Sequence, residues 1–214
     1  MPINKQQLFY AFSFTVFLQT LRLHYDLVIH VFKIPKRDYY LEFRYLTVWC
    51  MMLQFIYYAC RFFTSFSQKK NSFSAVLDYL RTVILFPVGF FVTIVFWGLF
   101  AINPYLLMSK EKLEMTNWNI QHLLHTAPLV IQFLESLFLN VPSRFNKNKI
   151  LKGQVLFQIL FTLNLFYFRS VTGKFPYPVL DVIWKKNVVY FFFACSICFL
   201  PFQGLTKLCQ KLKF

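Results

Sequence analysis

Residues 80–102 read LRTVILFPVGFFVTIVFWGLFAI, and this stretch decides the class of protein. From Thr82 to Ile102 it carries no charged side chain. A run of about 20 mostly apolar residues is what an α-helix needs to cross the hydrocarbon core of a bilayer. The stretch therefore predicts a membrane-spanning helix.

Five other stretches have a similar length and hydrophobicity, although the first of them is polar in its second half. With the stretch above, the candidate spans are residues 7–30, 45–63, 80–102, 120–139, 150–168 and 187–205. Proline, glycine and charged residues occupy the connections, as expected for turns between helices. We therefore expect an all-α fold, a six-span transmembrane helix bundle, with residues 1–214 forming one multi-pass domain.

The composition supports a membrane protein and excludes several other classes. The chain is 57% hydrophobic and 14% charged, whereas soluble domains carry about 25% charged residues. Such hydrophobicity excludes intrinsic disorder, and 30 Phe with 12 Tyr in 214 residues argue against an ordinary soluble enzyme. The net charge of +15 comes from basic residues between apolar runs. This arrangement favours membrane lipids with anionic head groups as partners, and no nucleic acid.

The cysteines and the amino terminus add little to this picture. Cys195 and Cys198 have CxxC spacing without a second ligand pair, so we interpret them as small residues of a membrane helix, with zinc or redox use as the alternatives. Lys5 precedes an apolar run that has no small-residue cleavage site, which indicates a retained first span. Lys and Arg divide almost evenly between the two sides. From their slight excess on the terminal side we expect cytoplasmic termini, in the endoplasmic reticulum, another endomembrane or the plasma membrane.

Six spans bring distant polar residues to one layer. The second and fourth spans enter from the side opposite the termini, and the fifth span ends there. Tyr45, Thr47, His122, His125 and Arg169 should therefore lie near one face of the membrane. Polar residues that gather inside a membrane domain are the default hypothesis for its functional site.

The two histidines of this layer have three possible uses. His122 and His125 are three residues apart, so their rings share one face of a helix. They could hold a metal, make structural hydrogen bonds or provide a general base. A zinc site needs three or four ligands, and Asp26 and Glu135 are the only carboxylates well inside the spans. We therefore predict no metal and no cofactor, while the structural and general-base alternatives remain open.

A general base implies a nucleophile, and Thr47 lies at about the depth of His125. The G-x-S-x-G signature of serine hydrolases is absent. A threonine in a membrane helix usually bonds the carbonyl four residues earlier, and this remains the simpler interpretation from spacing alone. Composition and spacing therefore stop at a polar membrane site that contains histidines.

A polar stripe on the first span offers another candidate. Arg22, Asp26 and His30 recur every four residues along one face. The simpler interpretation is a helix end in the head-group region. The more specific hypothesis is that Arg22 and Asp26 receive a substrate carboxylate.

Five short motifs occur in order between residues 43 and 178. They are FRYLT at 43–47, LFPVG with VFW at 85–97, W…HLLHT at 118–126, PSR at 142–144 and TGKFPYP at 172–178. Their order and spacing resemble those of the androgen-induced-gene family of membrane proteins. The resemblance implies a six-span fold and an atypical threonine hydrolase that cleaves fatty acid esters of hydroxy fatty acids.

The family's functional residues carry over onto this chain through these motifs. The resemblance implies that Thr47 is the nucleophile and His125 the essential histidine. His122, Gln121 and Asn119 are then candidates for orienting the base or the substrate. Phe43 and Arg44 replace the family's Trp and Lys, and one extra residue follows Trp118. These departures leave the threonine–histidine pair intact and affect the expected substrate preference.

A second functional class competes with the hydrolase. The same site in a non-catalytic lipid-binding or regulatory membrane protein would hold a lipid without cleaving it. A transporter is less favoured, because the chain has no paired repeat with broken helices.

Overall fold

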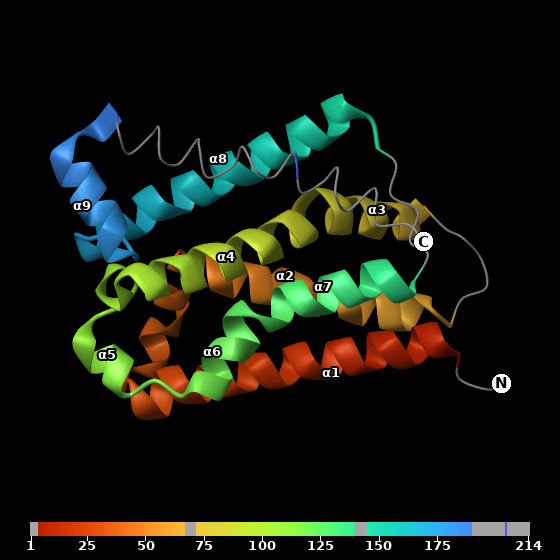
Figure 1. Ribbon diagram of the computed structural model, residues 1–214, viewed down its shortest axis with the longest axis horizontal. Helices are drawn as coiled ribbons and strands as arrows, with labels where there is room; N and C mark the ends of the chain where they lie inside the picture. Colours follow the sequence, from red (N-terminus) through yellow and green to blue (C-terminus); the bar gives the residue numbers. More distant parts are fainter. Residues whose placement is uncertain (1–3, 67–71, 140–144, 190–203, 205–214) are drawn as a thin grey trace.

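The computed structural model describes residues 4–66, 72–139, 145–189 and Gly204. All regular elements in these residues are helices, so the predicted all-α class is confirmed. The long helices run roughly along the longest axis of the molecule, as Figure 1 shows.

The helices differ widely in length. The longer ones are α1 (Lys5–Asp26), α2 (Leu46–Thr64), α4 (Phe86–Ile102), α7 (Ala127–Phe138) and α8 (Lys147–Thr172). The shorter α-helices are α3 (Ser72–Leu80), α5 (Lys110–Glu114), α6 (Trp118–His125) and α9 (Pro178–Lys186). Two π-helical segments, η1 (Leu27–Val31) and η3 (Arg81–Leu85), and two 3₁₀ segments, η2 (Lys36–Arg44) and η4 (Pro104–Leu106), complete the order.

Three continuous helices of the described chain are long and apolar enough to cross a membrane. They are Leu46–Thr64, Ser72–Ile102 and Lys147–Thr172, and α7 is a shorter apolar helix. The second of them joins α3, η3 and α4 into 31 residues, so it begins before the predicted start at residue 80. These helices are compatible with a membrane protein.

The other predicted spans differ from the expectation. Residues 7–30 lie in α1 and η1. Because of its polar residues, this stretch is not among the helices that are apolar enough to cross a membrane. The stretch 120–139 is divided at Thr126 into α6 and α7. Pro128 explains the break, because its ring clashes with a carbonyl one turn earlier and it lacks an N–H donor. Nearly all of 187–205 lies outside the described residues.

Close contacts with α4 hold the divided segment of α6 and α7 in place. A Cβ atom added to Gly89 of α4 would lie 3.3 Å from the Pro128 carbonyl oxygen and 3.2 Å from Gln54 Nε2. The missing side chain therefore lets α4 approach the start of α7. The Thr93 hydroxyl on α4 donates to the His125 carbonyl, which fixes the end of α6 against the same helix.

A buried ionic network crosses the half of the bundle nearer the N-terminus. Glu135 accepts hydrogen bonds from Tyr57 (2.6 Å) and Tyr58 (3.0 Å), and one of its oxygens lies 3.1 Å from Arg81 Nε. Arg61 of α2 pairs with Asp78 of α3 nearby. Two arginines thus face two carboxylates, so the burial of these charges is compensated.

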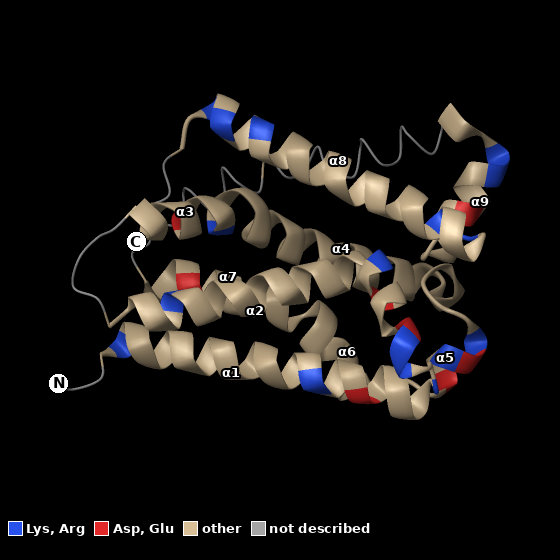
Figure 2. Cartoon of the chain, turned by 180° about the vertical axis from the view of Figure 1, so that it is seen from behind, with Lys and Arg blue, Asp and Glu red and all other residues tan. Residues whose placement is uncertain are grey.

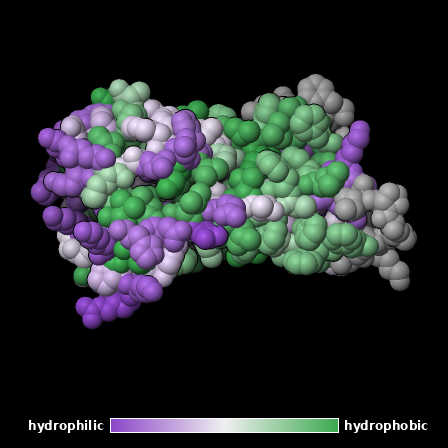
Figure 3. All heavy atoms as spheres, turned by 90° about the horizontal axis from the view of Figure 1, so that it is seen from below, coloured by the Kyte–Doolittle hydropathy of each residue, from purple (hydrophilic) through white to green (hydrophobic). Residues whose placement is uncertain are grey.

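Charged residues gather toward the two ends of the bundle, with fewer between them (Figure 2). On the face shown in Figure 3, hydrophilic residues cluster at the end that carries α5, and hydrophobic residues cover most of the rest. Large apolar side chains of α8, including Leu156, Leu160 and Leu163, are exposed. This distribution is typical of helices that face lipid.

Candidate active site

Thr47 lies at the start of α2, at the end of the bundle opposite the N-terminus. Tyr45 has extended backbone angles (φ −92°, ψ 131°) and begins the helix, so Thr47 occupies its first turn. The first N–H groups of a helix lack partners within it and give that end a partial positive charge. The Thr47 hydroxyl therefore sits where negative charge is stabilised.

His125 meets Thr47 from the last position of α6. Thr47 Oγ1 and His125 Nε2 are 3.3 Å apart, although 78 residues separate them in sequence. The imidazole is buried and stacks on Phe96 of α4, with ring centroids 3.5 Å apart. Stacking on Phe96 and the hydrogen bond from the Thr93 hydroxyl to the His125 carbonyl together hold the ring in one orientation.

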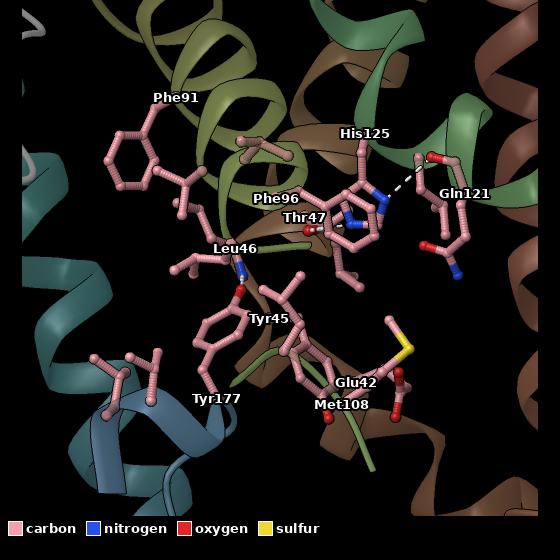
Figure 4. Close-up of a pocket in the computed structure, with 18 of the residues that line it drawn as sticks. Glu42, Tyr45, Leu46, Thr47, Phe91, Phe96, Met108, Gln121, His125 and Tyr177 are labelled. Carbon is pink, nitrogen blue, oxygen red and sulfur yellow. Dashed lines mark hydrogen bonds between the residues drawn. The ribbon is translucent and has the colours of Figure 1, made fainter. Parts of the chain in front are cut away.

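The surroundings of His125 determine its tautomer. Its Nδ1 lies 3.1 Å from the backbone oxygen of Gln121. A carbonyl oxygen can only accept, so Nδ1 carries the proton and donates it to this bond. Nε2 of the neutral ring is then an acceptor, so the Thr47 hydroxyl donates to it. Dashed lines in Figure 4 mark both contacts of the ring. A neutral histidine that accepts a hydrogen bond from a hydroxyl has the arrangement of a general base.

The pair opens on a large apolar cavity. The cavity has a volume of about 620 Å³ and is lined by Thr47, His125 and many apolar side chains of α4 and α8, among them Phe91, Leu99 and Phe161. Small-molecule sites typically enclose about 300–1,000 Å³. The cavity therefore has room for an apolar ligand beside the hydroxyl and the imidazole.

A small set of polar groups also lines this cavity. His24 Nε2 lies 3.6 Å from a Glu42 carboxylate oxygen, and its Nδ1 lies 3.1 Å from the Tyr39 hydroxyl. Lys112 of α5 is half-buried, and its ammonium lies 5.1 Å from the ring centroid of Phe32. Burial lowers the pKa of Lys112, while nearby Glu42 acts in the opposite direction. Among the described residues that line the cavity, Lys112 is the only lysine or arginine.

The residues proposed to orient the site have different positions. Gln121 is buried, lines the cavity and contributes its backbone oxygen to His125. His122 is exposed; its Nδ1 lies 3.2 Å from the Thr126 hydroxyl, and its ring stacks on Trp97. Asn119 is exposed in the first turn of α6, where its N–H donates to Asn117. Of the three, Gln121 is the residue that touches the base.

Arg22 and Asp26 do not reach the site. Arg22 is exposed and Asp26 half-buried, and neither lines the cavity. The reason is the rotation of α1, which turns His24 toward the interior instead. Arg169, expected in the polar layer, pairs with Asp181 of α9 at 3.1 Å and lies over Phe175 and Trp184.

Tyr177 is a polar residue of this site that sequence analysis did not select. Its hydroxyl oxygen accepts the N–H of Leu46 at 2.9 Å, directly before Thr47 in the chain, and it lines the cavity (Figure 4). The fifth motif contains this tyrosine, so the motif was the available signal. In the described part of the chain no three His, Cys, Asp or Glu residues come together as a metal site would need.

A profile of the FAR-17a/AIG1-like proteins matches residues 7–212. The chain belongs to this family. Thr47, His125 and Tyr177 all fall within the matched region. The resemblance expected from the five motifs is thereby confirmed.

Individual relatives agree with the assignment. The chain is 26% identical over 172 residues to the androgen-dependent TFPI-regulating protein of Mus musculus, covering 72% of this chain and 69% of the relative. Identity to the protein of the same name from Mesocricetus auratus is 24% over 163 residues, with the same coverage. The androgen-induced gene 1 protein of Homo sapiens is 27% identical over 122 residues, covering 56% and 50%. No solved structure matches the present chain.

Proposed function

We propose that this chain is an integral-membrane lipid hydrolase that cleaves fatty acid esters of hydroxy fatty acids. Thr47 is the nucleophile and His125 the general base. The observation that carries this proposal is the contact between the Thr47 hydroxyl and the unprotonated Nε2 of His125, beside an apolar cavity.

The chemistry follows from the tautomer of His125. An unassisted hydroxyl is a weak nucleophile, and an adjacent base activates it. His125 Nε2 takes the Thr47 proton as the oxygen attacks the ester carbonyl. The protonated imidazole then gives this proton to the leaving hydroxy fatty acid, and water, activated in the same way, releases the fatty acid from Thr47. The distance of 3.3 Å is long for a reacting pair, and such contacts often tighten when substrate binds.

The cavity fits the chemical character of this substrate class. Two acyl chains need apolar walls, which α4 and α8 provide. The substrate also carries one free carboxylate, and Lys112 offers a partly desolvated positive charge in the same cavity. The ester group would lie between these parts, next to Thr47.

We further propose that the chain crosses the membrane six times, with cytoplasmic termini, in an endomembrane or the plasma membrane. The joined helix of α1 and η1 has 22 and 5 residues, and at about 1.5 Å per residue it is longer than the hydrocarbon core. The helices α6 and α7 have 8 and 12 residues and follow each other through Thr126, which is about the length that one membrane span needs. Thr47 and His125 then lie near the face opposite the termini.

The test is ester hydrolysis by purified protein with three variants. Thr47→Val keeps the branched shape but removes the hydroxyl, so activity should be lost while the melting temperature stays near that of the wild type. Thr47→Ser should retain measurable activity. Thr15→Val is the matched control, because the Thr15 hydroxyl bonds only the Ala11 carbonyl of its own helix on the exposed side of α1.

The alternative function is lipid binding without catalysis. In that case the cavity would bind the ester, and Thr47→Val would change neither binding nor the background rate of hydrolysis. A fluorophosphonate probe separates the two functions, since a catalytic Thr47 should be labelled and a structural one should not. A stable Thr47→Val variant with undiminished hydrolysis would end the hydrolase proposal.

A further inference from the structure

The position of Tyr177 beside the nucleophile calls for a chemical explanation. Tyr177 follows the turn after α8 and directly precedes α9. Its hydroxyl reaches across to α2, where it accepts the N–H of Leu46, 131 residues away in sequence. A group that contacts the backbone directly before Thr47 is close to any carbonyl that Thr47 attacks.

Several contacts hold Tyr177 in this place. Gly173 has φ +74°, a left-handed conformation that ends α8 and reverses the chain. Asp181 then accepts from both Arg169 and the N–H of Phe175, which closes the loop. The Tyr177 ring packs edge-on against Tyr45, with centroids 5.6 Å apart. The phenol is therefore held rigidly at the cavity wall.

The phenol of Tyr177 lies within hydrogen-bonding reach of Thr47 as well as of Leu46. A tyrosine hydroxyl accepts through its oxygen and donates through its hydrogen. The oxygen accepts from the Leu46 N–H, and the Thr47 hydroxyl oxygen lies within reach of the phenol hydrogen. A substrate carbonyl oxygen bound beside Thr47 would replace it as the acceptor. Burial raises the pKa of Tyr177, so the phenol keeps its proton at neutral pH. A hydrogen bond received by the oxygen also makes its own proton a stronger donor.

We propose that Tyr177 donates the hydrogen bond that stabilises the oxyanion during ester cleavage. The inference rests on the proposed threonine hydrolase. As the Thr47 oxygen bonds to the carbonyl carbon, its proton moves to His125 Nε2 and the carbonyl π electrons move to oxygen. Tyr177 donates to this negatively charged oxygen without transferring its proton. When the intermediate collapses, the electrons return, the C–O bond to the leaving alcohol breaks, and His125 protonates that alcohol.

Figure 4 is consistent with this division of roles, because His125 and Tyr177 approach the start of α2 from different sides. The base therefore leaves the carbonyl oxygen free to turn toward Tyr177. The partly positive amino-terminal end of α2 favours negative charge at the same place.

The first test compares Tyr177→Phe with the wild type in ester hydrolysis. Loss of one oxyanion donor should lower kcat about 100- to 1,000-fold. KM should change little, because the bond forms mainly in the transition state. Tyr167→Phe removes a hydroxyl from an exposed tyrosine of α8 and should leave kcat unchanged. A Tyr177→Phe variant with wild-type kcat would overturn the proposal.

A second measurement separates the oxyanion role from a purely structural one, in which Tyr177 only accepts the Leu46 N–H at the start of α2. Replacing Tyr177 with 3-fluorotyrosine makes the phenol a better donor and its oxygen a poorer acceptor. An oxyanion donor should then give an unchanged or higher kcat, while a cap of the Leu46 N–H should give a lower melting temperature and a lower kcat. The second pattern would refute the proposal.

The failure of this proposal can be distinguished from failure of the hydrolase function. If Thr47→Ala is inactive while Tyr177→Phe is fully active, the hydrolase stands and Tyr177 has no oxyanion role. If Thr47→Ala is fully active, both proposals fail.

Discussion

His122 and His125 lie about one turn apart on α6, yet the fold gives them different surroundings. His125 is buried against Phe96 and contacts Thr47, whereas His122 is exposed and contacts Thr126 and Trp97. Sequence spacing placed both rings on one helix face, and packing separated their environments. The two histidines should therefore respond differently to substitution.

We expect His125→Ala to lower the rate of ester hydrolysis about 100- to 10,000-fold, the usual contribution of a general base. His122→Ala should cause a smaller loss, because it removes only contacts with Thr126 and Trp97. Rates and probe labelling of both variants give the comparison. Equal and complete loss in both, with rescue by added zinc, would instead indicate a metal site.

Lys112 provides a test of substrate selection. Removing its charge in Lys112→Met should raise KM for a free-acid substrate roughly 10- to 100-fold, the effect of losing one hydrogen bond to a charged group. The methyl ester of the same substrate lacks the carboxylate, so its KM should not change. Lys112→Arg keeps the positive charge, so it should recover most of the preference for the free acid over the methyl ester. Equal losses with the two substrates would contradict a carboxylate contact.

At the scale of the elements, the contact between α4 and the start of α7 places His125. Gly89 faces Pro128 and Gln54 without room for a larger side chain, whereas a Cβ atom at Gly98 on the same helix meets nothing within 4 Å. The two glycines therefore form a matched pair for testing this contact.

Gly89→Leu should lower the free energy of unfolding by about 1–3 kcal/mol, the usual cost of overpacking. Gly98→Leu should keep the melting temperature of the wild type, since its side chain enters open space. Thermal unfolding in detergent measures both variants. A melting temperature for Gly89→Leu equal to that of Gly98→Leu would show that α4 and α7 tolerate separation.

At the scale of the whole molecule, the fold separates the candidate active site from a charged, buried network. Residues of α5 and α9 line the same cavity as Thr47 and His125, whereas the Glu135–Arg81 pair joins α7 to η3, which follows α3. Figure 1 shows α5 and α9 at one end of the bundle and α3 at the other. Apolar helix surfaces connect the two ends. The candidate active site therefore lies toward one end of the helix bundle.

Cysteine accessibility tests this topology. Single cysteines at the exposed positions Lys36 and Lys110 should react with an impermeant reagent from the same side of sealed vesicles. A cysteine at Lys149, at the start of α8, should react from the opposite side. If the cysteines introduced at Lys36 and Lys110 react from different sides of the vesicle membrane, the chain does not cross the membrane six times.

The sequence by itself determined the helical class and the family, and its motifs selected the two residues of the candidate catalytic pair. Long apolar runs identify helices such as α2, α4 and α8, because the bilayer sets their length and composition. Ordered motifs identified Thr47 and His125, since a motif preserves residue types along the chain. Neither signal contains the rotation of a helix about its axis.

Only the tertiary structure decided which polar side chains share the cavity. Rotation of α1 selects His24 over Arg22 and Asp26, and the break at Pro128 ends α6 beside α2. The carbonyl of Gln121 sets the tautomer of His125, and a distant loop places Tyr177 beside Leu46. These properties depend on contacts between segments far apart in sequence, so hydropathy and spacing could not reveal them.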